Sequence, residues 1–242
     1  MPMSHPKIET CLSPSLLHLY DIKESIVVII DVFRATSTIA AALHQGAKEI
    51  IPVDDVQLCI EIGQRIPNSV TAGERDGQVA PGLQHGNSPL EYTRSFIEDK
   101  SLILTTTNGT RLLHMCHDAS EIISGSFLNL SSVCNYLLTQ NKPVLLACAS
   151  WKNRFNLEDA LFAGAVYDRI GAQFEMNCDS TRAAKALYTQ AKSDLYSFIQ
   201  DSSHFIRLSK FGLQYDMEYC CMVDKHDVLV KYDGEKLLAT PN

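Results

Sequence analysis

Several signals of common protein classes are missing from this sequence. No apolar run is long enough to span a bilayer, and the first residues lack the basic and apolar regions of a secretory signal. The formal net charge of -7 argues against a surface that binds nucleic acid or an anionic membrane. We therefore expect a cytoplasmic protein without a membrane or nucleic-acid partner.

Cysteine and glycine motifs for metals and nucleotides are missing too. None of the eight cysteines forms a Cys-x-x-Cys pair, and most lie in apolar periodic segments, so we expect buried free thiols in a reducing compartment. With only His114 and His117 at helical spacing, a zinc site is not expected. The absence of a Walker A element and of a Gly-x-Gly-x-x-Gly turn argues against nucleoside triphosphate and dinucleotide binding.

The sequence does contain a regular alternation of apolar strands and helices. Residues 26–30 are all β-branched, which is typical of a strand buried on both faces, and the Ala-rich run from Ala35 is typical of a helix packed behind it. Repetition of this pattern predicts an α/β fold with a mainly parallel or mixed central sheet. A long helix is expected over residues 180–196. No repeat or linker interrupts the 242 residues, which favours a single domain over residues 1–242.

Polar turns follow four of the expected strands. The first turn contains Asp31 and Arg34, and the second contains Glu74, Arg75 and Asp76. The third contains Asn108, Gly109, Thr110 and Arg111, and the fourth contains Glu158 and Asp159. Ligands bind at the carboxyl ends of strands in open α/β sheets, so these turns are expected to converge on one site. Acids that hold Mg²⁺, next to arginines and helix N-termini that bind phosphate oxygens, predict a phosphoryl-transfer site.

Each turn taken alone also fits ordinary helix capping. Glu158 and Asp159 are favoured in a first helical turn by the helix dipole, whatever else they do. The segment Gly86–Pro89 is expected to begin another helix whose amides face an anion. In the tail, Asp216 and Asp224 are expected at the surface.

Six sequence blocks, in order, carry a resemblance to a known family. They are Asp-Val-Phe-Arg-Ala-Thr-Ser-Thr from Asp31, Gly-Glu-Arg-Asp-Gly from Gly73, Gly-Asn-Ser-Pro from Gly86, Thr-Thr-Thr-Asn-Gly-Thr-Arg from Thr105, Gly-Ser-Phe-Leu-Asn from Gly125 and Phe-Asn-Leu-Glu-Asp-Ala from Phe155. Over residues 25–225 the chain resembles the 2-phosphosulfolactate phosphatase family. The resemblance implies a three-layer α/β/α fold and a Mg²⁺-dependent phosphoric monoester hydrolase. Its expected reaction converts 2-phospho-3-sulfolactate to 3-sulfolactate and phosphate, a step of coenzyme M biosynthesis.

The resemblance also implies roles for individual residues. The acids expected nearest the metal are Asp31, Glu74, Asp76 and Glu158. Asp31, Arg34 and Arg75 are the expected catalytic residues, with the two arginines on phosphate or sulfonate. Substrate-binding residues are expected at Asn87, Ser88, Asn108, Gly109, Thr110 and Ser126. The loop Trp151–Arg154 departs from the glycine-rich turn expected there, which leaves substrate choice open at the sulfonate end.

Alternatives stay open for both mechanism and function. Asp31 as a nucleophile would give an aspartyl-phosphate, but enzymes of the haloacid-dehalogenase type carry a second Asp two residues on, where this chain has Phe33. Metal-activated water, with Asp31 as a ligand or base, is therefore favoured. A non-catalytic anion-binding protein and a phosphatase of another small monoester also fit, whereas a phosphotransferase is disfavoured by the missing nucleotide motifs. The expected partner is a small phosphorylated, sulfonated organic acid, and a homo-oligomer is left open.

Overall fold

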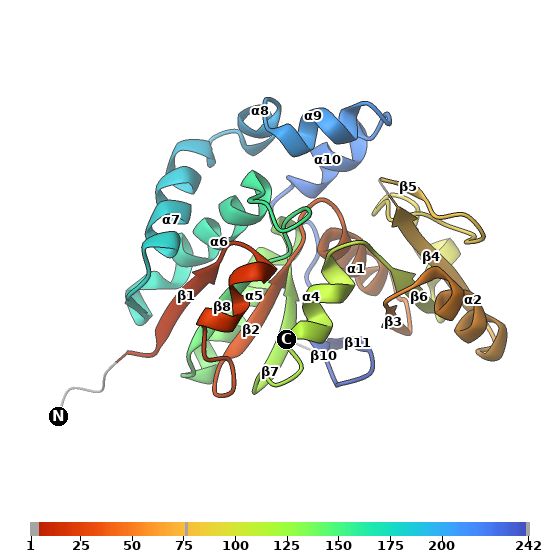
Figure 1. Cartoon of the computed structure of the whole chain (residues 1–242), viewed down its shortest axis with the longest axis horizontal. Coiled ribbons are helices and arrows are strands. Elements are labelled where there is room, and N and C mark those ends of the chain that lie inside the picture. Colours follow the sequence, from red (N-terminus) through yellow and green to blue (C-terminus); the bar gives the residue numbers. More distant parts are fainter. Residues whose placement is uncertain (1–4, 76, 241–242) are drawn as a thin grey trace.

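The fold is built on one mixed β-sheet. The computed structural model describes residues 5–75 and 77–240, and within them eleven strands lie in the order β5-β4-β6-β3-β11-β10-β7-β2-β8-β1-β9. The strands are β1 (Lys7–Cys11), β2 (Ile26–Ile30), β3 (Glu49–Val53), β4 (Ser69–Arg75), β5 (Gln78–Val79), β6 (Ser101–Thr105), β7 (Glu121–Gly125), β8 (Val144–Cys148), β9 (Glu175–Met176), β10 (Leu229–Tyr232) and β11 (Leu237–Thr240). Figure 1 shows the sheet running across the molecule.

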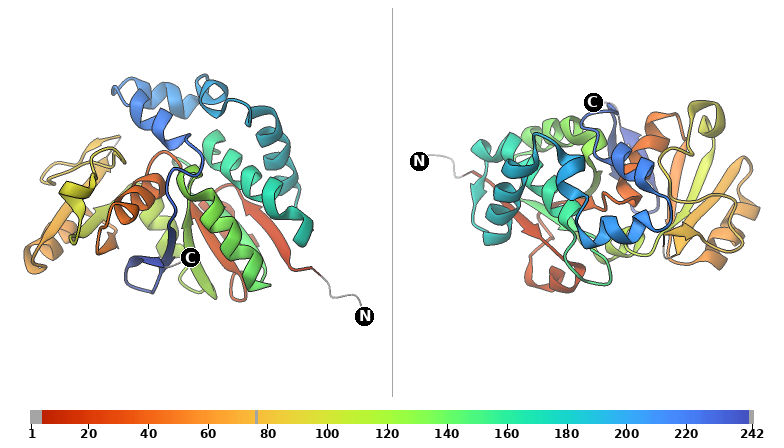
Figure 2. Two further views of the ribbon diagram at one scale, coloured as in Figure 1. Left: turned by 180° about the vertical axis from the view of Figure 1, so that it is seen from behind. Right: turned by 90° about the horizontal axis from the view of Figure 1, so that it is seen from above.

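Helices cover both faces of this sheet. They are α1 (Ala35–His44), α2 (Val56–Arg65), α3 (Arg94–Ile97), α4 (Gly109–Met115), α5 (Leu130–Gln140), α6 (Leu157–Ile170), α7 (Asp179–Ala191), α8 (Leu195–Ile199), α9 (Ser203–Ser209) and α10 (Gln214–Cys220), with 3-10 turns η1 (Pro14–Leu19), η2 (Phe127–Asn129) and η3 (Gly171–Gln173). Helix α4 lies in front of the sheet in Figure 1, and α5 lies in front in the view from behind in Figure 2. The predicted three-layer α/β/α fold is confirmed.

Strand β2 is the buried centre of the sheet, as its sequence predicts. All five of its residues are buried, and it pairs in parallel with β7 and with β8. Side chains alternate between the faces of a strand, so Val28 and Ile30 join a core with α5, α6 and α7. Val27 and Ile29 join a second core that includes residues of α1 and α4. Packing on both faces fixes the point at which β2 ends and Asp31 begins.

The antiparallel strands make the sheet mixed rather than wholly parallel. The hairpin β10–β11 pairs with β7 on one side and with β3 on the other. It therefore joins β2 and its neighbours to the outer strands β3, β6 and β4, which pair in parallel. The C-terminal residues thus complete the middle of the sheet.

One predicted helix is wrong in extent, and another does not form where it was predicted. The helix expected over residues 180–196 ends at Ala191, and α8 starts afresh because the Asp194 side chain accepts the Ser197 backbone N–H at 3.0 Å. No helix follows Gly86–Pro89 directly, because the Gly86 N–H donates to the Glu91 carboxylate at 3.0 Å and the segment forms a turn. The next helix, α3, begins only at Arg94.

The remaining composition-based expectations concern thiols and membranes. All eight cysteines lie in the described residues and none is in a disulfide, which confirms the free thiols. In residues 5–75 and 77–240, no helix combines the length and the apolar character needed to cross a bilayer.

The contact between α6 and α7 depends on one glycine. A Cβ at Gly164 would lie 2.1 Å from the Ala184 carbonyl oxygen of α7. We expect Gly164→Ala to lower the free energy of unfolding by about 1–3 kcal/mol, because α7 must move outward. Urea titration measures this, with Ala183→Ser, an exposed change on α7, as the control. Equal stability of Gly164→Ala and the control would contradict the close packing.

Candidate active site

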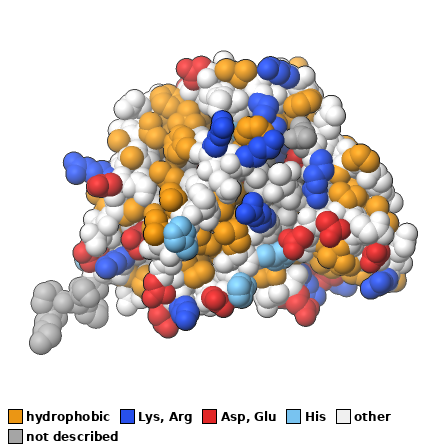
Figure 3. Space-filling view, in the orientation of Figure 1, with side chains coloured by type: hydrophobic (Ala, Val, Ile, Leu, Met, Phe, Trp, Pro, Cys, Tyr) orange, Lys and Arg blue, Asp and Glu red, His pale blue; other side chains and the backbone are white. Residues whose placement is uncertain are grey.

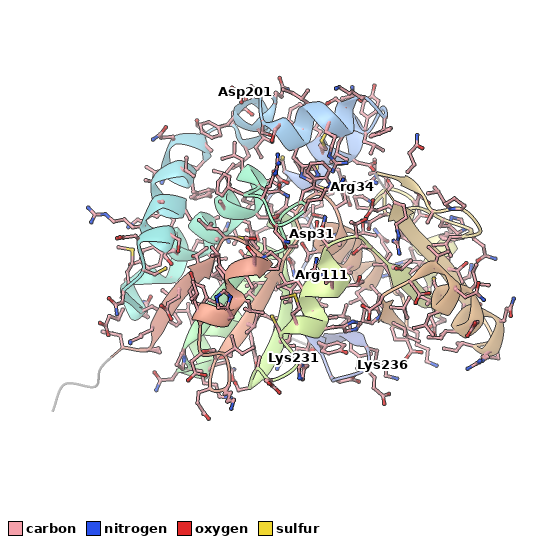
Figure 4. All side chains as sticks on the ribbon, viewed as in Figure 1. Asp31, Arg34, Arg111, Asp201, Lys231 and Lys236 are labelled. Atoms are coloured by element: carbon pink, nitrogen blue, oxygen red, sulfur yellow. The ribbon has the colours of Figure 1, made fainter. Side chains whose placement is uncertain are left out.

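A cavity lies at the carboxyl ends of the central strands. Predicted residues that line it are Asp31, Arg34, Glu74, Asn87 and Asn108, and they are joined by Phe33, Thr107, Trp151, His204 and Arg207. Figure 4 shows Asp31 and Arg34 near the centre of the molecule, below the helices that close its top. The strand-end turns therefore converge as the sequence predicts, and α9 adds His204 and Arg207, which belong to none of the strand-end turns.

Asp31 is buried at the end of β2, with only 8% of its surface exposed. Burial raises its pKa to about 7, and the nearby carboxylates of Glu74 and Glu158 act in the same direction. A Cβ at Gly109 would lie 3.0 Å from Asp31 Oδ2 and 2.9 Å from the Ala35 Cβ. The first residue of α4 must therefore be glycine for this helix to approach the acid so closely.

Asp159 holds the two loops beside Asp31. Its Oδ1 accepts the Val32 N–H at 2.9 Å, and its Oδ2 accepts the Ser150 N–H at 3.2 Å. Burial raises the pKa of Asp159 well above its ordinary value, and the charges of Glu158 and Asp31 add to the rise. This side chain therefore ties the turn after β2 to the turn after β8.

Glu158, next in sequence, anchors a chain of polar contacts that reaches the cavity. The residue is fully buried, and its Oε1 lies 2.5 Å from His204 Nδ1. His204 Nε2 lies 2.7 Å from a terminal nitrogen of Arg207. The Arg207 guanidinium stacks on the Trp151 ring, 4.4 Å from its centroid. Helix α9 is thereby fixed to the start of α6 and to the loop after β8.

Glu74 performs a similar anchoring role on the other side of the cavity. Its Oε1 accepts the Thr107 N–H and its Oε2 accepts the Gly77 N–H, each at 2.9 Å. The carboxylate joins the turn after β4 to the turn after β6. Asp76, predicted as a metal ligand, lies outside the described residues.

Arg34 forms a buried ion pair with Asp216 of α10. Its other terminal nitrogen donates to the Gly77 carbonyl at 3.1 Å, and Asp216 also accepts the Ser88 hydroxyl at 2.8 Å. The expectation that Asp216 is a surface residue is therefore wrong, because α10 packs over the cavity and turns Asp216 inward. Asp224 is exposed, as expected.

Four predicted site residues use their side chains outside the cavity lining. Arg75 donates to Thr105 Oγ1 at 3.1 Å and to the Glu74 carbonyl. The Thr110 hydroxyl donates to the Thr106 carbonyl at 3.0 Å, within the turn that starts α4. Ser126 forms a capping box with Asn129, and the Ser88 hydroxyl donates a hydrogen bond to the Asp216 carboxylate. Hydrogen bonds to neighbouring residues therefore engage all four side chains.

His204, Arg207 and Asp216 were missed for a common reason. They lie on short C-terminal helices with no recognisable motif, far in sequence from the strand-end turns. The only signal was a histidine placed among apolar residues of the buried face of α9, beside Phe205 and Leu208.

The donor set fits a hard cation with few protein ligands. In the described part of the chain, no three or more His, Cys, Asp or Glu side chains are grouped closely enough to hold a metal ion by themselves. Mg²⁺ usually takes one or two carboxylates and completes its shell with water and phosphate oxygens. Asp31 is a buried carboxylate in the cavity lining, and the nearby Glu158 Oε2 is buried without a hydrogen-bond partner, so both have the chemistry of such ligands.

Comparison with known proteins points to one family. A family model described as 2-phosphosulpholactate phosphatase matches residues 11–235. A relative from Caldanaerobacter subterraneus subsp. tengcongensis is 39% identical, over 87% of this chain and 89% of its own. Relatives from Thermotoga petrophila and Clostridium novyi are 41% and 33% identical, over 81% and 96% of this chain and 84% and 99% of theirs. All three are named probable 2-phosphosulfolactate phosphatases.

The raised pKa of Asp31 predicts a pH-dependent gain in stability when its charge is removed. An acid with a pKa near 7 when folded and 3.8 ordinarily destabilises the fold above pH 4, because it ionises more easily once unfolded. Asp31→Asn should raise the free energy of unfolding at pH 8 by on the order of 2 kcal/mol, and the gain should shrink as the pH falls through about 7 towards 4.

Urea titrations at pH 8 and pH 5 with excess chelator measure this effect. Asp118→Asn, on an exposed carboxylate, is the matched control and should show no such dependence. An equal gain from Asp31→Asn at both pH values would contradict the buried charge.

Proposed function

This chain belongs to the 2-phosphosulpholactate phosphatase family, and we propose that it hydrolyses 2-phospho-3-sulfolactate to 3-sulfolactate and phosphate with bound Mg²⁺. The observation that carries the proposal is the position of Asp31, a buried acid at the end of β2 in a cavity lined by arginines and amides. We further propose a cytoplasmic enzyme that acts in coenzyme M biosynthesis on this small acid.

The residues of the cavity suit the binding of a phosphate ester. The hydroxyl of Thr107 is buried without a hydrogen-bond partner and lines the cavity, so it can donate to a phosphate oxygen. The Asn87 residue is 3% exposed, and its Oδ1 also lacks a hydrogen-bond partner. This oxygen can therefore accept a hydrogen bond from the substrate or from a bound water. Such buried groups gain hydrogen bonds only when a ligand or water arrives.

Asp31 and Glu158 would hold Mg²⁺, and the bound ion would supply positive charge opposite the phosphate oxygens. Asp31 orients the attacking water by accepting its hydrogen bond at a carboxylate oxygen. Asp159 keeps the Asp31 turn in position through the Val32 N–H. Phe33 lines the cavity where a second catalytic acid would stand in an aspartyl-phosphate mechanism, which supports attack by water.

The proposal predicts chelator-sensitive phosphate release that depends on Asp31. With Mg²⁺, the protein should release phosphate from 2-phospho-3-sulfolactate faster than from other small phosphate monoesters, and excess chelator should stop release. Asp31→Asn should lower kcat by at least about a hundredfold, because it removes the orienting carboxylate.

The control for this assay is Asp118→Asn, which removes an exposed carboxylate and should keep full activity. Release that is unaffected by chelator would remove Mg²⁺ from the proposal. No release from any ester, alongside measurable phosphate binding, would instead support a non-catalytic anion-binding protein.

A further inference from the structure

The loop after β8 contains a tight turn whose first residue lines the cavity. The Trp151 N–H donates to the Arg154 carbonyl at 3.2 Å, and the Arg154 N–H donates to the Trp151 carbonyl at 2.9 Å. The two residues between them, Lys152 and Asn153, have positive φ angles of 51° and 61°, as in a type I′ turn. The Asn153 carbonyl accepts the Ser13 hydroxyl at 3.0 Å. The turn is therefore closed by its own hydrogen bonds and fixed to the loop after β1.

Lysine is an unusual residue at its position in this turn. The central positions of type I′ turns usually hold Gly, Asn or Asp, because most side chains are strained at positive φ. Asn153 fits this pattern, whereas Lys152 does not. Glycine at position 152 would form the same turn with less backbone strain. The lysine is therefore better explained by what its side chain does than by the turn.

The Lys152 side chain lies at the mouth of the cavity. Its Nζ is 4.6 Å from the centroid of the Trp151 ring. Trp151 lines the cavity that contains Asp31 and is only partly buried, so its ring belongs to the mouth. Lys152 is exposed, and within residues 5–75 and 77–240 no carboxylate forms an ion pair with it. The turn and the indole thus hold a positive charge at the mouth.

The region around the cavity is positively charged as well. Figure 3 shows Lys and Arg side chains gathered in the upper half of this face, whereas most Asp and Glu side chains lie in its lower half. Asp31 and Arg34 lie in the upper half in the same orientation (Figure 4). A chain with a formal net charge of -7 therefore presents positive charge around its cavity, and such a field attracts anionic ligands.

We propose that Lys152 binds the sulfonate of the substrate and thereby selects phosphate esters with an anionic tail. The inference rests on the proposed function, which places the phosphate beside buried Asp31. In 2-phospho-3-sulfolactate, one carbon separates the sulfonate from the carbon that carries the phosphate, whereas the carboxylate is attached to that carbon directly. The sulfonate therefore reaches further from the phosphate towards the mouth. An ammonium on a flexible stem can follow its three oxygens without a fixed geometry.

Binding of product analogues tests the proposal without turnover. Because Trp151 is the sole tryptophan and lies beside Lys152, its fluorescence reports on ligands at this point. Lys152→Met should weaken the binding of isethionate and 3-sulfolactate by about 3- to 10-fold, as expected for a lost ion pair near the surface. The binding of lactate and inorganic phosphate should change little. Lys152→Arg keeps the charge and should bind isethionate nearly as well as the wild type.

Salt and a distant lysine provide the controls. The difference between the wild type and Lys152→Met should shrink at high salt, because exposed charges are screened. Lys23→Met removes an exposed lysine before β2, at the opposite end of that strand from the cavity, and should bind all four ligands as the wild type does. A difference for isethionate that is the same at low and high salt would contradict an ion pair.

Lys152→Gly separates the role of the charge from that of the turn. Glycine accepts the positive φ without strain, so this variant should unfold at about the same urea concentration as the wild type. It should nevertheless lose as much isethionate binding as Lys152→Met. A clearly lower urea midpoint for Lys152→Gly, with isethionate binding unchanged in both variants, would assign the lysine to the stability of the turn and overturn the proposal.

The remaining outcomes of the titrations decide between the anionic groups. A loss confined to lactate would assign Lys152 to the carboxylate and overturn the sulfonate assignment. An equal loss for inorganic phosphate would place Lys152 on the phosphate and overturn the selectivity role. Unchanged binding of all four ligands in Lys152→Met would overturn the proposal entirely.

Kinetics then test selectivity in the reaction. We expect the ratio of kcat/KM for 2-phospho-3-sulfolactate to that for glycerol 2-phosphate to fall by about 3- to 10-fold in Lys152→Met and to recover in Lys152→Arg. An unchanged ratio in Lys152→Met would contradict the selectivity role. If the wild type releases phosphate from no ester, the proposed function fails, whereas the fluorescence titrations still decide whether Lys152 binds a sulfonate.

Discussion

Crowding of buried carboxylates around the end of β2 is the constraint on which the rest of this structure depends. Asp31, Glu158 and Asp159 are all at least nine-tenths buried, and like charges in a low-dielectric interior repel strongly. Asp159 is compensated by two backbone N–H groups and Glu158 by an imidazole. Asp31 is left with a pKa of about 7. A bound cation would lower the free-energy cost of keeping these carboxylates buried and charged. The arrangement therefore suits a site that becomes more stable when a cation is bound.

The C-terminal part of the chain completes both the sheet and the site. The β10–β11 hairpin joins the two groups of parallel strands, and α9 and α10 bring His204, Arg207 and Asp216 over the cavity. These contacts join residues more than a hundred positions apart, such as Arg34 and Asp216. Cavity geometry and folding of the C-terminal half are thus physically coupled. Figure 2 shows these helices across the top of the molecule.

Patterns within a few neighbouring residues predicted much of the fold and part of the site. The five β-branched residues of β2 predicted a buried strand, and strand-end geometry then placed Asp31, Glu74 and Asn108 at one cavity. Ser126 and Thr110 were less predictable, because a hydroxyl at a helix start can cap the helix or bind a ligand equally well. His204 and Arg207 depend on the docking of α9, which no local pattern specifies.

The central claim is that the carboxylate of Asp31 meets a cation and a phosphate in one cavity. A crystal structure of the protein with Mg²⁺ and inorganic phosphate tests it most directly. The account predicts Mg²⁺ coordinated by Asp31, with the phosphate between it and the cavity residues Thr107 and Asn108. Mg²⁺ and phosphate bound elsewhere, with the Asp31 cavity holding only water, would contradict the account.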